Sequence, residues 1–252
     1  MKIIYKILFF ILLFILFTSC YTYSKRILRI DNNWKKDTLQ NYLLYYKPLS
    51  KTDKNLPKTK LRIDSAIAKA KKKAQVFDFK KPPFHLFILE NQKDFIPFEK
   101  IPYQGLTYAK SNTILVTQNF CSETHEYFHL LSIQQWGETK VWIKEGSATF
   151  SDEKFHGKNV HSLCHYLFKE NKLMSFDSLF SDRKFVKNSY RVSYPQSGSL
   201  VSYIIEKYGF DIFLQVWKAK NIKPLHISKE KLKEDWILFI QKYPTNGIKF
   251  SI

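Results

Sequence analysis

The sequence contains few cysteines, glycines and prolines. Three cysteines in 252 residues are too few for a small fold held together by disulfides, and they form no Cys-x-x-Cys pair. Seven glycines and nine prolines exclude collagen-like and low-complexity chains. Repeats with a period of about 20–50 residues, which solenoids and propellers require, are also missing. A hydrophobic fraction of 44% with 17% aromatic residues excludes a disordered chain and predicts a globular domain.

Acidic residues are scarce as well. The chain has 22 of them and 41 lysines and arginines, which gives a net charge of +19. The lysines are scattered, and Lys71-Lys72-Lys73 is the only run of three. We therefore expect no nucleic-acid partner, because nucleic-acid sites gather basic residues on one face. The charge either favours anionic surfaces such as lipid headgroups or reflects a general bias of composition toward lysine.

The N-terminal apolar segment is short for a membrane span. Two lysines precede an uninterrupted apolar run over 7–17, which has the length of a secretory signal rather than of a transmembrane helix. Small residues and Cys20 follow, and the whole resembles a bacterial lipoprotein signal, although Phe17 stands where leucine is more usual. The resemblance implies a signal peptide over 1–19, lipidation of Cys20 and an exported, membrane-anchored protein of the cell envelope. An uncleaved N-terminal anchor is the alternative.

Hydrophobic spacing predicts an α+β fold with a small sheet in the first half and helices in the second. Within residues 20–58 we expect a tether at 21–32 and an N-terminal helix at 33–47, where apolar residues follow a helical spacing. Beyond residue 59 the pattern predicts a helix at 61–77, buried strands at 84–89 and 112–117, and helices at about 120–136, 142–154, 159–171, 194–207, 210–219 and 229–242.

The stretch His125-Glu126-Tyr127-Phe128-His129 is an H-E-x-x-H motif. Residues four apart project from one face of an α-helix, so both imidazoles can direct a nitrogen at one Zn²⁺ about 2.0–2.1 Å away. Glu126 is turned about 100° around the helix and can take a proton from a water that the metal activates. The alternative is a helix whose histidines are only packed and hydrogen-bonded.

A third metal ligand must come from another segment. Position 135 is Gln135 rather than a histidine, so the longer metzincin pattern fails. Glu145 is the better candidate, because Gly137 allows a chain reversal after the first helix and a second leg of similar length returns to Glu145. Gly146 and Ala148 follow, and such small residues let the second helix approach the first.

These motifs, H-E-x-x-H followed by W-I-x-E-G-x-A-x-F, resemble the gluzincin metallopeptidases, in particular the small peptidase-MA-like group. The resemblance implies that His125, His129 and Glu145 bind Zn²⁺ and that Glu126 is the general base. It also implies an α+β catalytic domain over 59–252, with a small N-terminal sheet packed on the motif helix and a mainly helical C-terminal half.

The same resemblance suggests two supporting roles. An aspartate four residues after the glutamate ligand orients a zinc histidine in thermolysin-like enzymes; here that position is Thr149, and Asp152 is the alternative. Tyr194 opens a serine-rich segment like that of the family's later helix and is the candidate donor to the oxyanion. It can instead be a packed residue at a helix start, and Tyr190 and His226 are further candidates.

The remaining histidines and the two cysteines after Cys20 indicate a function less specifically. His161, Cys164 and His165 share a helix face, which suits either a second metal cluster or a partly buried surface. Cys121 lies one turn before the motif and is either a small core residue or a neighbour of the metal, and a Cys121–Cys164 disulfide is chemically allowed in an exported protein. His85 alternates within a strand and is expected to be structural.

The sequence therefore predicts a zinc-dependent metallopeptidase that acts on a peptide or protein substrate at the cell envelope and contacts the membrane through Cys20. Two alternatives remain. One is a non-catalytic lipoprotein that keeps the fold as a binding module, and the other is an amidase that acts on cell-wall amides with the same metal chemistry.

Overall fold

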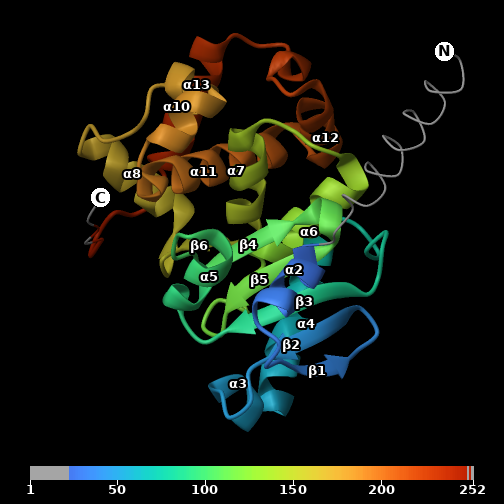
Figure 1. Ribbon diagram of the computed structural model, residues 1–252. Helices are drawn as coiled ribbons and strands as arrows, with labels where there is room; N and C mark the ends of the chain where they lie inside the picture. The colour runs from blue at the N-terminus through green and yellow to red at the C-terminus, as the bar shows by residue number, and fades with distance from the viewer. Residues whose placement is uncertain (1–22, 249, 251–252) are drawn as a thin grey trace, which may run out of the picture. The chain divides into compact units, whose positions relative to one another are not determined.

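The computed structural model describes residues 23–248 and residue 250; the expected signal peptide (1–19) and Cys20 lie outside this part of the chain. The fold is α+β, as predicted. The described chain forms two compact units (Figure 1). We call them the sheet unit, residues 23–59 and 81–121, and the helical unit, residues 60–80 and 122–250.

The sheet unit is built on a five-stranded mixed sheet with the order β1-β2-β3-β5-β4. Its three inner strands are parallel and the two outer pairs are antiparallel. The inner strands are continuous apolar runs because both faces of a central strand are buried. The elements of the sheet unit are α2 (Tyr23–Ile30), β1 (Lys35–Thr38), β2 (Tyr42–Tyr46), α3 (Lys51–Lys54), β3 (Phe84–Leu89), η1 (Gln92–Phe95), α5 (Ile96–Glu99), β4 (Gly105–Tyr108), η2 (Ala109–Ser111) and β5 (Thr113–Thr117).

Two of these strands confirm the sequence prediction, and two replace a predicted helix. β3 spans 84–89 as expected, and β5 begins one residue later than predicted. The helix predicted at 33–47 is wrong, because this segment forms β1 and β2, joined by a turn in which Leu39 N donates to Tyr42 O at 3.0 Å. The run 42–46 (YLLYY) places apolar side chains on every position, which suits a buried strand better than one face of a helix.

The tether predicted at 21–32 is also wrong where the structure describes it. Tyr23 and Ile27, four residues apart, bury one face of the helix α2. The Tyr23 ring stacks on Tyr108 of β4 with the ring centroids 3.8 Å apart, and Arg26 donates to the carbonyl of Phe98 at 3.0 Å. Moreover, β2 pairs with β3, so the described residues before residue 59 belong to the same sheet unit as β3, β4 and β5.

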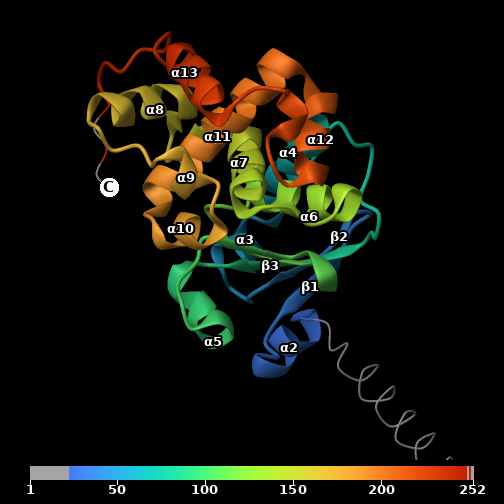
Figure 2. The same cartoon turned by 90° about the horizontal axis from the view of Figure 1, so that it is seen from above.

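The helical unit contains the motif segment and the predicted C-terminal helices, which are confirmed with shifts of a few residues at their ends. Its core is aromatic, with Trp142, Trp217 and Trp236 at most 2% exposed. Figure 2 shows α8, α11 and α13 gathered around this core. The elements are α4 (Leu56–Ala74, in this unit from residue 60), α6 (His125–Trp136), α7 (Val141–Asp152), β6 (Lys154–Phe155), β7 (Lys158–Asn159), α8 (Val160–Lys169), α9 (Phe176–Leu179), α10 (Asp182–Lys187), α11 (Tyr190–Tyr208), α12 (Phe210–Ala219), η3 (Lys223–Leu225) and α13 (Lys229–Ile240).

Two glycines allow α7 and α11 to lie in direct backbone contact. A Cβ added at Gly146 would lie 2.7 Å from the carbonyl oxygen of Ser197, and one added at Gly198 would lie 2.6 Å from Cγ2 of Thr149. Neither position tolerates a side chain without movement of one helix. This contact fixes α11, and with it Tyr194, against the helix that carries the predicted glutamate ligand.

No helix in the described part of the chain combines the length and the apolar character needed to cross a membrane.

Candidate metal centre

The helix α6 starts at His125 and presents both motif histidines on one face. The imidazoles of His125 and His129 lie edge to face, with their centroids 4.7 Å apart. Both residues are buried, at 9% and 7% exposed. The helix ends at Gly137, whose φ of +81° is a conformation that glycine adopts without cost, and the chain then reverses into α7, as the sequence predicted.

Glu145 of α7 brings its carboxylate to the two imidazoles. Its Oε2 lies 3.2 Å from Nε2 of His129 and 3.5 Å from Nε2 of His125. In a tetrahedral site with ligand bonds of about 2.0–2.1 Å, neighbouring ligand atoms lie about 3.3 Å apart. All three ligand atoms fall within 4.8 Å of one another, and these residues are the one group of this kind among the described residues. His125, His129 and Glu145 can therefore hold a metal ion together.

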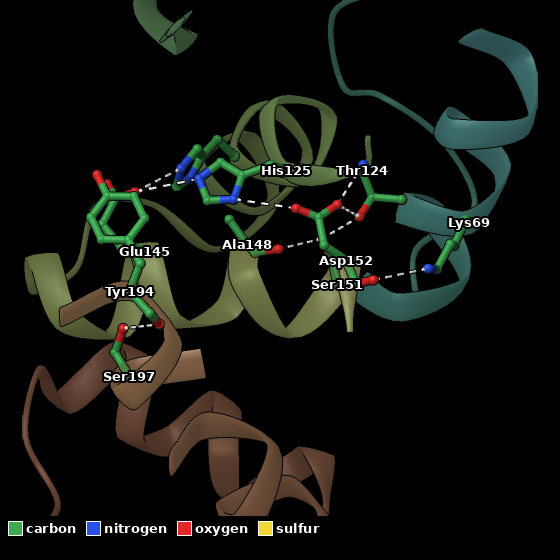
Figure 3. A network of polar contacts seen from close by, with 10 residues as sticks. Lys69, Thr124, His125, Glu145, Ala148, Ser151, Asp152, Tyr194 and Ser197 are labelled. Atoms are coloured by element: carbon green, nitrogen blue, oxygen red, sulfur yellow. Dashed lines mark hydrogen bonds and ion pairs between the residues drawn. The ribbon is translucent and has the colours of Figure 1, made fainter. Parts of the chain in front are cut away.

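Asp152 at the end of α7 contacts the other nitrogen of His125. Its Oδ2 lies 3.6 Å from Nδ1 of His125, and its Oδ1 accepts hydrogen bonds from the amide of Thr124 at 2.7 Å and from the Thr124 hydroxyl at 2.6 Å. Figure 3 shows His125 between the carboxylates of Glu145 and Asp152. Such a carboxylate on the far nitrogen of a metal-binding histidine fixes the ring orientation and raises its basicity.

Of the two candidates Thr149 and Asp152, Asp152 is the one that contacts His125. The hydroxyl of Thr149 is buried without a hydrogen-bond partner among the described residues, and so is Nδ1 of His129. Asp152 thus lies against Nδ1 of His125, whereas Nδ1 of His129 has no such carboxylate beside it among the described residues. Thr124 was missed by the sequence analysis, although a threonine directly before the first helical residue is a common helix-start signal.

The electrostatics of the site follow from its burial and its two carboxylates. Burial lowers the pKa of His125, but the hydrogen bonds with Asp152 and Glu145 outweigh this effect and raise that pKa to about 10. Burial raises the pKa of Glu145, but the adjacent His129 and His125 hold it well below its usual value. The two carboxylates thus favour the protonated form of His125, and a metal ion that binds there competes with this proton.

Glu126, the predicted general base, is 6% exposed in the first turn of α6. It neighbours His125 in the chain and does not belong to the group of ligand atoms that converge. The negative charge of Glu126 contributes to the raised pKa of His125, so this buried carboxylate lies near the candidate metal ligands.

Tyr194 of α11 lies against the metal site. Its ring is parallel to the imidazole of His125, with an interplanar angle of 4° and a centroid distance of 6.0 Å (Figure 3). Three further rings surround Tyr194 at centroid distances of 6.0–6.5 Å, namely Phe155, Phe185 and Tyr190. Tyr190 is 49% exposed, so an aromatic cluster extends from the metal site to the surface of the helical unit.

The second metal cluster suggested by the sequence is not formed. Nδ1 of His161 pairs with the Ser199 hydroxyl at 2.9 Å, Cys164 donates to the carbonyl of Pro195, and Nδ1 of His165 pairs with the carbonyl of Tyr243. These contacts make the trio a packed helix face.

The remaining cysteine and histidine candidates are also structural. Cys121 and Cys164 are buried and form no disulfide, so the bond that the sequence allowed between them is not present. Cys121 donates to the carbonyl of Gln118 at 3.0 Å. Nδ1 of His85 pairs with the hydroxyl of Tyr45 at 3.2 Å, as expected of a structural strand residue. His226 ends η3 as an exposed residue.

A scan of the sequence against protein-family models finds no match, and a search of the curated proteins finds none either.

Proposed function

We propose that this protein is a zinc-dependent metallopeptidase of the gluzincin type. The observation that carries the proposal is the convergence of His125, His129 and Glu145, whose ligand atoms lie within 4.8 Å of one another, with Oε2 of Glu145 at 3.2 Å and 3.5 Å from the two imidazole nitrogens. The buried carboxylate of Glu126 acts electrostatically on His125. Two histidines and one glutamate leave a fourth position open for water or substrate, which is typical of catalytic zinc sites. Imidazole and carboxylate ligands in a small buried site favour Zn²⁺ over Mg²⁺ or Ca²⁺, which prefer oxygen ligands.

A Zn²⁺ held by His125, His129 and Glu145 would lower the pKa of a water molecule to about 7 and would polarise the carbonyl of the scissile peptide. Glu126 takes the proton of the attacking water and then passes it to the leaving amine. Tyr194 donates its hydroxyl to the oxyanion of the tetrahedral intermediate. Asp152 holds His125 in one orientation throughout, so the ligand set does not reorganise during the reaction.

The substrate in this proposal is a peptide or protein at the cell envelope, which the enzyme reaches after export. Cys20, which lies outside the described residues, would carry the lipid that anchors the protein to the membrane. Incorporation of a labelled fatty acid into the wild-type protein, but not into the Cys20→Ser variant, tests this part separately from the chemistry.

The activity itself is tested by metal removal and return. The purified protein is treated with a chelator and incubated with a peptide mixture, before and after one equivalent of Zn²⁺ is added, and cleavage is followed by mass spectrometry. We expect cleavage only with Zn²⁺ and none from the His129→Ala variant under either condition. Stoichiometric zinc without cleavage of any peptide would contradict a peptidase and favour a binding lipoprotein or a cell-wall amidase.

A further inference from the structure

A second candidate site lies in the sheet unit, apart from the metal ligands. A cavity of about 790 Å³ opens where β3 and β5 end, and residues that directly follow these two strands form much of its wall. β3 and β5 are parallel neighbours, so their carboxyl ends meet at one edge of the sheet. Ligands of open parallel sheets bind outside this edge, and the cavity lies within the size range of small-molecule sites, about 300–1,000 Å³.

The backbone around this cavity is held by hydrogen bonds. Gln118 N donates to the carbonyl of Leu89 at 2.7 Å, which ties the segment after β5 to the end of β3. Thr117 N donates to the carbonyl of Gln104 at 2.8 Å, which fixes the residue before β4. Asn91 caps η1 by accepting from Lys93 N at 2.9 Å. Side chains on such a frame are preorganised for a ligand.

Carboxamides dominate the lining of the cavity, which we call the amide groove. Asn91, Gln92, Gln104 and Asn119 all line it. Each carboxamide offers one acceptor and two donors without a net charge. The side-chain amides of Gln92, Gln104 and Asn119 are exposed and have no hydrogen-bond partner in the described part of the chain, so a ligand meets them without first breaking a bond within the protein.

The charge of the amide groove differs from that of the whole chain. The chain carries +19, whereas the groove is lined by a single cation, Lys93, and a single anion, Glu90. Oε2 of Glu90 already accepts a hydrogen bond from the amide of Lys51 at 3.0 Å, whereas its Oε1 is buried without a partner among the described residues. A site for phosphate or an anionic polymer would gather cations, and this one does not.

An aromatic ring completes the lining. Phe120 is half-buried at the wall of the amide groove. Paired donors and acceptors without charge match the neighbouring hydroxyls of a sugar, and a ring offers an apolar surface to the C–H groups of a pyranose. An extended peptide is instead recognised mainly by the main chain of a sheet edge, whereas side chains at strand ends line this groove.

We propose that the amide groove binds a neutral, hydroxyl-rich ligand, a short segment of a glycan chain. The site does not depend on the metal or on the proposed peptidase activity.

The test is isothermal titration calorimetry of the full chain with two neutral sugars, chitotriose and maltotriose, and with a capped tetra-alanine peptide. We expect saturable binding of at least one sugar and no binding of the peptide. The double variant Gln104→Ala/Asn119→Ala removes two exposed amides and should weaken sugar binding by about tenfold or more. Gln40→Ala removes an exposed amide outside the groove and should leave sugar binding unchanged. His129→Ala removes a candidate metal ligand and should also leave sugar binding unchanged, which separates this result from the fate of the metal site.

Three outcomes would overturn the proposal. They are the absence of saturable binding for both sugars, sugar binding that is equal in the double variant and the wild type, and binding of the tetra-alanine peptide that the double variant abolishes. A melting temperature equal to that of the wild type shows that a variant has lost sugar binding and not its fold.

Discussion

Asp152 contacts His125 with one carboxylate oxygen and the start of α6 with the other. Its Oδ2 lies 3.6 Å from Nδ1 of His125, and its Oδ1 accepts from the amide and the hydroxyl of Thr124. The last residue of α7 is thereby joined to the first residues of the motif helix. The same side chain both orients a metal ligand and secures the helix that carries it.

Asp152→Asn should therefore weaken zinc binding while leaving all three ligands in place. Loss of a carboxylate behind a metal-binding histidine typically lowers affinity by about 10–100-fold. Asp177→Asn is the matched control, because Asp177 pairs with Lys229 on the surface of the helical unit. Competition with a zinc-binding dye measures both affinities, and equal values for the two variants would contradict the positioning role.

Gly198→Ala should destabilise the helical unit. Alanine would gain about 1 kcal/mol in helix propensity, but its Cβ would lie 2.6 Å and 2.8 Å from the side chain of Thr149. Overpacking of this kind costs about 1–3 kcal/mol or more, so we expect a net loss of stability in urea unfolding. Ser202→Ala, at a half-buried position of the same helix, is the control; a Gly198→Ala protein as stable as this control would refute the close contact between α7 and α11.

Buried His161 should make the protein less stable in mild acid. Burial lowers its pKa from 6.5 to about 4, so between these values the unfolded state binds the proton and the folded state does not. Stability thus falls as the pH falls from about 6.5 to about 4, by up to about 3 kcal/mol. His161→Asn removes this titration, and its free energy of unfolding should decline less than that of the wild type between pH 7 and pH 4. Parallel declines would show that His161 does not contribute.

The aromatic cluster around Tyr194 should influence substrate choice if the proposed peptidase activity holds. Tyr190 is 49% exposed beside Tyr194. Tyr190→Ala should raise KM several-fold for peptides with an aromatic residue beside the scissile bond and should change kcat less. The reason is that a contact made equally in the ground state and the transition state affects substrate binding rather than the chemical step. Val186→Ala, which removes a 67% exposed apolar side chain, is the control. A uniform fall in kcat for all peptides would argue against this role.

The parts of the structure that the sequence predicted are those with a local cause. The H-E-x-x-H spacing and the apolar run at 84–89 each determine their element without help from distant residues. The segment 33–47 failed because Trp34, Leu39, Tyr42 and Tyr46 also satisfy a helical spacing; its pairing with β3, forty residues away, decides for a strand. Such non-local pairing leaves no signal within the segment itself.

The same distinction between local and non-local causes applies to the candidate metal centre. Glu145 was predictable because a reversal at Gly137 limits where the chain can return. Asp152 and Thr149 lie three residues apart on α7, so which of them reaches His125 depends on how α7 is rotated against α6. This rotation results from packing between helices, such as the contact of α7 with α11 at Gly146 and Gly198, and not from the local sequence. The sequence therefore identified both candidates but could not predict which of them contacts His125.

The most direct test of the central claim compares the zinc-loaded wild type with Glu126→Gln on the same peptide mixture. We expect both proteins to bind one equivalent of zinc, because Glu126 lies outside the group of ligand atoms. We expect the cleavage rate of the variant to be lower by at least about 100-fold, which is the smallest effect typical of losing a general base. Equal cleavage by both proteins would contradict the proposed role of Glu126 and, with it, the metallopeptidase mechanism.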